Sequence, residues 1–263
     1  MKCYEIVECL EELSPKHYAS DWDNVGLLVG RREKEVTKIM VALDASCEVV
    51  KMAADKGVDM LVTHHPMIFS SVKQINEDNF TSEKILTLAE NGIAYYAMHT
   101  NFDTVGGMGE LAAGPGYLDL KDCEPLIFES DDTEGMGRGG RLPRPMTGRQ
   151  AAEYVKERFG LSFVMLYQSK TLEDKVFDKA AILPGSGKGE ISEVKKLGYE
   201  LYITGDYGHH PGIDAMDMGM TVIDATHYGL ERIFTPFIAE YLKNKCEKLE
   251  VIEADTGAPV RII

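Results

Sequence analysis

Histidine is scarce in this sequence, and most of its histidines follow short apolar runs. Six of the seven come at or just after the end of a predicted strand: His64, His65, His99, His209, His210 and His227. In α/β proteins, ligands bind beyond the carboxyl ends of strands. Histidines scattered at random would not favour those positions. The pattern therefore predicts a functional site built on imidazole groups.

His64 and His65 are adjacent, directly after the predicted strand Asp59–Thr63. Successive side chains of an extended chain point to opposite sides, so a single metal ion would not readily accept both rings. Two ions about 3.5–4 Å apart could each accept one ring. The alternative is one core histidine beside one surface histidine. Pro66 favours an extended backbone at His65 under either interpretation.

His227 and Glu231 are four residues apart, which places both side chains on one face of a helix. An ordinary side-chain pair has the same spacing, and Asp103, just past the predicted strand Ile93–Met98, could be a helix cap. Together with His64 and His65, these residues provide three imidazoles and two carboxylates. Such a mixture of nitrogen and oxygen donors suits zinc, manganese, iron, cobalt or nickel better than calcium.

Alternating strands and helices are expected to position these residues. Apolar runs predict strands at Lys38–Asp44, Asp59–Thr63 and Ile93–Met98. Ser46 is expected to cap a helix that runs to about Lys56, and a second helix is expected from Thr81 to about Asn91. This β-α-β-α-β order predicts a largely parallel or mixed sheet covered by helices.

A second α/β set follows a region rich in glycine, proline and arginine between Asp131 and Gly148, which predicts turns or a flexible connection at a lobe boundary. We expect a first lobe over 1–124, a second lobe over 125–220, and a return to the first lobe over 221–263. The elements expected in the later part are helix Gln150–Phe159, strand Ser162–Tyr167, strand Lys179–Leu183, helix Glu190–Leu197, strand Glu200–Thr204, strand Thr221–Asp224, a long helix from about Tyr228 to Lys245, and strand Leu249–Ile252.

The composition restricts the partners. With 28 Lys and Arg against 43 Asp and Glu, the net charge is −15, which argues against nucleic acid or anionic lipid as a general partner. A small anionic substrate is compatible, because a bound metal ion reverses the local charge. The N-terminal segment is an acidic amphipathic helix rather than a signal peptide, and no apolar run is long enough to span a bilayer. We expect a cytoplasmic protein whose five widely spaced cysteines are reduced and buried.

Two further features attract attention and favour simpler interpretations. The segment Pro184–Gly189 lacks the spacing of a phosphate-binding loop, so a glycine turn into a helix is the favoured interpretation. Arg138, Arg141, Arg144 and Arg149 form a basic island, for which a solvated loop is the default interpretation and phosphate binding or a subunit contact the secondary one.

Several motifs occur in one order: Ser20–Gly30 (SDWDNVGLLVG), Thr63–Pro66 (THHP), His99–Asp103 (HTNFD), Gly185–Gly187 (GSG), Thr204–Asp206 (TGD) and His227-x-x-x-Glu231. In this respect the chain resembles the dinuclear metal-binding family of GTP cyclohydrolase I type 2 homologues, also called the NGG-interacting-factor-three-like family. The resemblance spans nearly the whole chain. One departure is Thr226, at a position where the family usually has glycine.

The resemblance implies that His64, His65, Asp103, His227 and Glu231 bind two divalent transition-metal ions per chain, with Glu231 bridging them. It implies two α/β lobes with mixed sheets flanked by helices, a metal site in the cleft between them, and a toroidal hexamer. The implied activity is that of a metal-dependent hydrolase acting on a nucleotide-like substrate, with His99 as the candidate for proton transfer. The alternatives are a phosphoester hydrolase and a non-enzymatic metal-binding regulatory or interaction protein.

Overall fold

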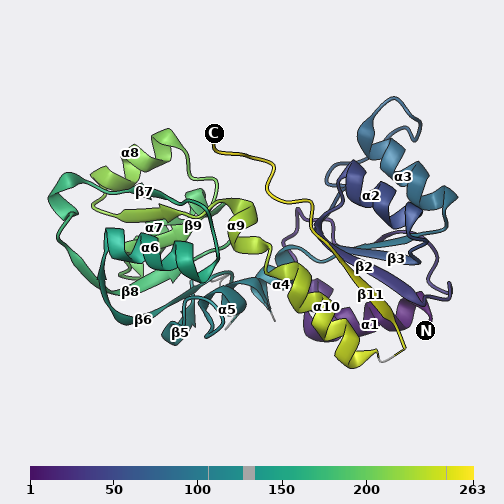
Figure 1. Ribbon diagram of the computed structural model, residues 1–263, viewed down its shortest axis with the longest axis horizontal. Coiled ribbons are helices and arrows are strands. Elements are labelled where there is room, and N and C mark those ends of the chain that lie inside the picture. Colours follow the sequence, from purple (N-terminus) through teal and green to yellow (C-terminus); the bar gives the residue numbers. More distant parts are fainter. Residues whose placement is uncertain (106, 127–133, 247) are drawn as a thin grey trace. The chain divides into compact units, whose positions relative to one another are not determined.

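The computed structural model describes residues 1–105, 107–126, 134–246 and 248–263 (Figure 1). The chain divides into two compact units, Met1–Gly106 with Phe234–Ile263, and Gly107–Ile233. Each unit contains one mixed sheet flanked by helices, which confirms the expected fold class. The lobe boundaries expected from sequence, after residues 124 and 220, lie inside the second unit. No helix in the described part of the chain is both long enough and apolar enough to cross a membrane.

The first unit is built on a five-stranded sheet with the order β1-β4-β3-β2-β11. Its strands are β1 (Gly26–Val29), β2 (Lys38–Asp44), β3 (Met60–His65), β4 (Ala94–Ala97) and β11 (Glu250–Ala254). Neighbouring strands are parallel except β1, which is antiparallel to β4. The carboxyl ends of β2, β3 and β4 therefore lie along one edge of the sheet.

Helices cover both faces of this sheet. They are α1 (Cys3–Leu13), η1 (Lys16–Tyr18), α2 (Cys47–Asp55), α3 (Phe80–Glu90), α4 (Thr100–Thr104) and α10 (Phe234–Lys245). Val49 and Val50 of α2 and Leu88 of α3 pack in one buried cluster with residues of β2, β3 and β4, whereas α1 and α10 lie on the opposite face (Figure 1). The predicted cap of α2 is confirmed, because Ser46 Oγ accepts a hydrogen bond from the N–H of Val49.

The second unit contains a six-stranded sheet with the order β5-β6-β8-β9-β10-β7. Its strands are β5 (Lys121–Pro125), β6 (Arg138–Thr147), β7 (Met165–Tyr167), β8 (Val176–Ile182), β9 (Leu201–Thr204) and β10 (Thr221–Asp224). Its helices are α5 (Met108–Ala113), α6 (Gly148–Arg158), η2 (Lys170–Leu172), η3 (Gly187–Gly189), α7 (Ile191–Lys196), α8 (His209–Asp217) and α9 (His227–Glu231). The central strands β8, β9 and β10 are parallel, and the outer pairings are antiparallel.

The glycine- and proline-rich region is not mainly a flexible connection. Of the predicted stretch, residues 131–133 lie outside the described residues, and Arg138–Thr147 forms the ten-residue strand β6. Arg138 is buried: it donates hydrogen bonds to the carbonyls of Gly135 and Gly137 and pairs with Glu110 at 2.8 Å. The solvated-loop interpretation is therefore wrong for Arg138, which is a structural residue.

The single long C-terminal helix expected from Tyr228 to Lys245 is also wrong. Helix α9 ends at Glu231 and α10 begins at Phe234. Pro236 explains the interruption, because its ring would clash with the carbonyl four residues earlier, that of Arg232, and it has no N–H to donate. The break falls where the chain passes from the second unit back to the first.

Candidate metal centre

His64 and His65 end the parallel strand β3 at the edge where β2 and β4 also end. His64 is fully buried, and its Nδ1 lies 2.9 Å from the carbonyl oxygen of Met98. A carbonyl only accepts hydrogen bonds, so Nδ1 is the donor and the lone pair of the neutral ring is on Nε2. His64 Nε2 lies 3.5 Å from Oδ1 of Asp103. This is the tautomer in which a histidine binds metal through Nε2.

His65 is oriented by a carboxylate from the neighbouring strand. Asp44, the last residue of β2, pairs in register with His65, and its Oδ1 lies 2.8 Å from Nδ1 of His65. Because a carboxylate accepts, Nδ1 donates and Nε2 is again the nitrogen with the lone pair. Metal-bound histidines commonly donate a hydrogen bond from their other ring nitrogen to a carboxylate, which fixes the orientation of the ring.

His99 follows β4 and is held by Asp23 from the loop before β1. Both carboxylate oxygens of Asp23 lie within 3.1 Å of Nδ1 of His99, and Thr100 donates to Asp23 through both its N–H and its hydroxyl. Burial alone would raise the pKa of Asp23, but the hydrogen bonds from His99 and Thr100 outweigh it and lower the pKa to about 2. Asp23 is therefore a fixed anion behind the His99 ring.

The three rings form one cluster within the first unit. Their centroids are 4.8 Å apart for His64–His65, 5.1 Å for His64–His99 and 5.4 Å for His65–His99. One nitrogen from each ring lies within 4.8 Å of the others, so the three could share a metal ion. Asp103 approaches His64 from α4, as its sequence position just after β4 predicts. The sheet thus brings together four of the six candidate residues.

The other two candidates, His227 and Glu231, lie on α9 in the second unit. His227 Nε2 is 2.9 Å from Oε2 of Glu231, and Nδ1 is 2.9 Å from Oδ2 of Asp206, which follows β9. The Glu231 side chain is only 3% exposed. The helical spacing of four residues therefore does place imidazole and carboxylate together, and a third aspartate–histidine pair orients the ring.

Two glycines give these residues room. A Cβ at Gly185 would lie 2.5 Å from Oε1 of Glu231, and one at Gly205 would lie 2.5 Å from the backbone nitrogen of His227. Thr226, before His227, has φ 64° and ψ 151°, a region that glycine normally occupies. Its hydroxyl accepts a hydrogen bond from the N–H of Gly229 and caps α9. The local backbone is therefore strained and tightly packed.

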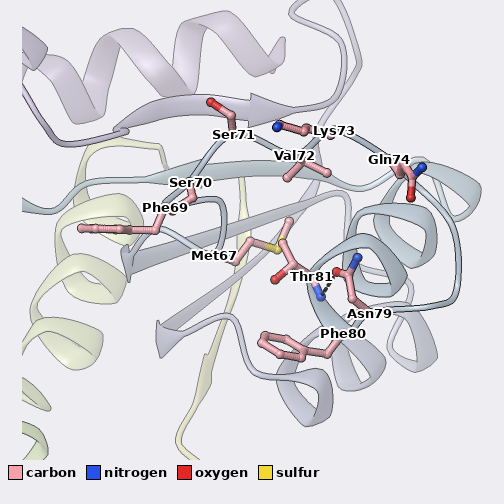
Figure 2. A pocket seen from close by; sticks show the side chains of 10 residues that line it. All are labelled: Met67, Phe69, Ser70, Ser71, Val72, Lys73, Gln74, Asn79, Phe80 and Thr81. Atoms are coloured by element: carbon pink, nitrogen blue, oxygen red, sulfur yellow. Dashed lines mark hydrogen bonds between the residues drawn. The ribbon is translucent and has the colours of Figure 1, made fainter.

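The first unit has a pocket of about 560 Å³. It is formed by the loop after β3 and the start of α3, and Figure 2 shows Phe69 turned away from Met67 and Phe80. The Phe69 ring instead lies 5.7 Å from that of Trp22, and the Trp22 ring lies 6.1 Å from that of His99. Trp22 and Phe69 are both more than half exposed. Exposed rings of this kind can stack on a planar heterocycle.

Sequence reasoning missed the aspartates that orient the rings, namely Asp23, Asp44 and Asp206. Asp44 ends an apolar run, Asp206 follows one, and Asp23 and Asp206 belong to the motifs quoted above, so these positions were the available signal. In contrast, His209 and His210 are exposed at the start of α8 and belong to no metal-binding group among the described residues. The Pro184–Gly189 segment forms a turn and η3, and the N–H of Gly187 is bonded to the Thr204 hydroxyl.

Comparison with known proteins identifies a family. The family model described as Duf34/NIF3 (NGG1p interacting factor 3) matches residues 1–259. A relative in Clostridium perfringens is 34% identical over 253 residues, which cover 94% of this chain and 93% of the relative. Another in Methanocaldococcus jannaschii is 34% identical over 262 residues, covering 97% and 100%. Both relatives are named GTP cyclohydrolase 1 type 2 homolog.

Solved structures agree on the fold. A Bacillus cereus protein related to NIF3 superposes with a TM-score of 0.91 at 23% identity, covering 100% of this chain and 99% of the other. Reduced HcgD from Methanocaldococcus jannaschii superposes with a TM-score of 0.84 at 33% identity, covering 97% and 98%. The two-sheet architecture is therefore shared along essentially the whole chain.

Proposed function

The chain belongs to the Duf34/NIF3 family, and from this membership and its histidine cluster we propose that it is a metal-dependent hydrolase with two divalent transition-metal ions, acting on a nucleotide-like substrate. One observation carries the proposal. The rings of His64, His65 and His99 converge at the carboxyl edge of a parallel sheet, and backbone or carboxylate acceptors fix two of them with the lone pair on Nε2.

The donor set fits such ions. Neutral imidazoles with carboxylates suit zinc, manganese, iron, cobalt or nickel, and Asp44 and Asp206 supply the outer hydrogen bonds that metal-bound histidines usually have. In the second unit, the absence of a side chain at Gly185 leaves room beside Oε1 of Glu231. We propose His64, His65, Asp103, His227 and Glu231 as the ligands, with Glu231 shared by both ions.

Covalent geometry supports assigning both sets of ligands to one centre. Phe234 packs against His64 with ring centroids 5.2 Å apart, and Glu231 is only three residues earlier in the chain. Three residues span at most about 10 Å even when fully extended. Glu231 is therefore joined by only three residues of chain to a residue that packs against His64, which supports the proposal that both contribute to one centre.

Two such ions would supply a hydroxide-like nucleophile at neutral pH and would neutralise an anionic substrate. The protein side chains do the rest. Asp23 fixes His99 through Nδ1, so Nε2 of His99 is positioned to take up and return a proton. The exposed rings of Trp22, which lies beside His99, and of Phe69, which lies beside Trp22, are suited to hold a planar base. This aromatic pair is the feature that favours a nucleotide-like substrate over a simple phosphoester.

The test is metal reconstitution followed by a substrate screen. Chelated protein is reloaded separately with zinc, manganese, iron or cobalt, and elemental analysis should give about two ions per chain. Nucleotides and phosphoesters are then screened for turnover with each metal. A plateau at one ion contradicts the dinuclear centre. Full loading with no turnover on any substrate favours the alternative of a non-enzymatic metal-binding regulatory protein.

Glu231→Gln sharpens this test. The substitution keeps the shape of the side chain but removes the charge, so the variant should fold and yet lose at least one ion per chain. His17→Gln is the matched control, because His17 lies in η1 and contacts Tyr18 rather than the cluster. An unchanged metal content in Glu231→Gln would remove Glu231 from the centre.

The family resemblance also leads us to propose a toroidal hexamer. Light scattering coupled to size exclusion should then give six times the chain mass of 29.2 kDa. A monomeric or dimeric mass would contradict this proposal without affecting the metal assignment.

A further inference from the structure

A second cavity in the first unit lies beside His65 and is not explained by the metal ligands. It has a volume of about 760 Å³, within the usual range of small-molecule sites. Its wall is formed by the end of β2, the start of α2, the residue Lys84 from α3, and residues 256–259 after β11. Since His65 also lines it, a molecule in this cavity would lie next to a proposed metal ligand.

Lys84 is the unusual residue of this cavity. Its side chain comes from α3 and the residue is only 8% exposed, yet it forms no ion pair with a carboxylate in the described part of the chain. Its Nζ donates to the carbonyl of Ala45 at 2.8 Å and lies 5.6 Å from the centre of the Phe80 ring. Buried ammonium groups are normally compensated by an anion. Among the described residues, Ala45 accepts one hydrogen bond from Lys84, and two further N–H donors of the ammonium group can bind a ligand.

The first turn of α2 adds donors to the same wall. Ser46 and Cys47 line the cavity, and Ser46 Oγ caps the N–H of Val49. The earlier N–H groups of a helix have no carbonyl partner within it, and the helix dipole favours an anion at this end. Helix α2 has nine residues, long enough for this effect.

Two carboxylates also line the cavity and must be weighed. Asp44 accepts the hydrogen bond from Nδ1 of His65 at 2.8 Å and keeps its negative charge, which also attracts the ammonium group of Lys84. Glu48 is exposed, so its charge is largely screened by water. Lys84 is the buried charge of the wall, whereas Asp44 and Glu48 are both exposed to water, which screens their charges.

We propose that this cavity binds the phosphate group of a small-molecule substrate, with Nζ of Lys84 and the first N–H groups of α2 as donors. The rest of the substrate then extends toward His65. This inference rests on the proposed function, which identifies the reacting part of the substrate. The residues of the phosphate site itself all belong to the first unit. It therefore makes a prediction that does not depend on metal loading.

The first experiment measures binding to the metal-free full-length chain by calorimetry, with inorganic phosphate, guanosine monophosphate and guanosine as probes. Phosphate and the nucleotide should bind to the wild type, and Lys84→Met should weaken both about tenfold or more, because a charge-assisted hydrogen bond is lost. Lys84→Arg should retain most of the affinity. The control is Lys51→Met, an exposed lysine of α2 that pairs with Asp55. Equal affinities in wild type and Lys84→Met, or no binding of either phosphate probe, overturn the proposal.

Cys47 provides a second test that needs no substitution. Its thiol is exposed and lines the cavity, whereas Cys123, the other exposed cysteine, lies in the second unit. Phosphate should slow the alkylation of Cys47 by N-ethylmaleimide several-fold in the metal-free chain and leave Cys123 unchanged, as measured by peptide mass spectrometry. Equal effects of phosphate on both cysteines, or none on Cys47, would also overturn it.

These outcomes separate the phosphate site from the proposed hydrolase. Phosphate binding that depends on Lys84, without turnover by the metal-loaded chain, leaves the phosphate site in place and removes the hydrolase. Turnover by the metal-loaded chain without phosphate protection of Cys47 supports the hydrolase and overturns the phosphate site.

Discussion

The two sets of candidate ligands are built in different ways. In the first unit, His64, His65 and His99 sit at the ends of β3 and β4, where the register of a parallel sheet fixes their positions. In the second unit, His227 and Glu231 stand on the five-residue helix α9, which begins at the strained residue Thr226 and needs glycines beside it. One set is placed by regular structure and the other by tight local packing.

The difference indicates where each set is vulnerable. A sheet edge tolerates changes in loops because the strand pairing maintains the register. A short helix held by close backbone contacts tolerates fewer changes, because one added methyl group must displace the backbone itself. Orientation, in contrast, is achieved in the same way in both units, by an aspartate at Nδ1 of a histidine.

The largest expected effect is at His99, the member of the first set that we assign to proton transfer rather than to metal binding. His99→Gln should retain both ions yet lose roughly a hundredfold in turnover, the usual contribution of a general acid or base. Elemental analysis and steady-state kinetics on the substrate found by the screen measure both quantities. Loss of an ion would instead make His99 a ligand, and full activity would return it to a structural role.

The packing of the second set is tested next by Gly205→Ala. The new Cβ would lie 2.5 Å from the nitrogen of His227, so we expect a loss of about 2 kcal/mol or more in unfolding free energy and weaker metal binding at His227. Gly189→Ala is the matched control, since nothing lies within 4 Å of its added carbon. Urea denaturation checks the stability. Equal stabilities of the two variants would show that the second unit adjusts more easily than its packing suggests.

The aspartate–histidine pair of the first set should be visible in the pH dependence of stability. Asp23 has a pKa of about 2 against its ordinary value of 3.8, so its charged form stabilises the fold by about 2 kcal/mol above pH 4. This contribution is lost as the pH falls from about 4 toward 2. Asp23→Asn should therefore be destabilised at pH 7, and the gap to wild type should narrow by pH 3. A gap that is the same at both pH values would contradict this account.

The smallest effect is expected at Thr226. Thr226→Gly relieves a backbone conformation that costs about 1–3 kcal/mol. Loss of the threonine cap should cost only a few tenths of a kcal/mol, and the greater flexibility of glycine in the unfolded chain costs more. We therefore expect the free energy of unfolding to rise by about 0.5–1 kcal/mol. Thr147→Gly is the control: Thr147 caps α6 in the same manner but with an ordinary φ of −69°. It should only destabilise. Thermal unfolding compares the two, and a destabilised Thr226→Gly would mean that the strain is small.

The sequence predicted the elements whose signal is local. Strands β2 and β10 have the predicted bounds because a polar residue stops each apolar run, and the histidines at strand ends follow from the same pattern. Strand β6 was hidden because Pro143 and Pro145 fall where its pairing with β8 is interrupted, between Arg141 and Met146. The break between α9 and α10 is caused by Pro236. The hydrophobic periodicity did not reveal the effect of this proline on the preceding turn.

The orienting aspartates could not be assigned from sequence for a different reason. Asp23 and His99 are 76 residues apart, and only the antiparallel pairing of β1 with β4 brings their loops together. Likewise, the packing around Gly205 arises from contact with the backbone at Thr226 and His227, a neighbour that only the parallel β9–β10 pair creates. Long-range register, rather than composition, decides these contacts.

The link between α9 and α10 has a consequence for how metal and fold depend on each other. Arg232 is anchored to the second unit by its hydrogen bond to the carbonyl of Phe159, and Phe234 packs against His64 and Phe102 in the first. Two peptide units, each at most about 3.8 Å long, join these anchors. In the proposed centre, Glu231 is therefore a tethered ligand, and bringing it to an ion held by His64 incurs little loop-closure entropy.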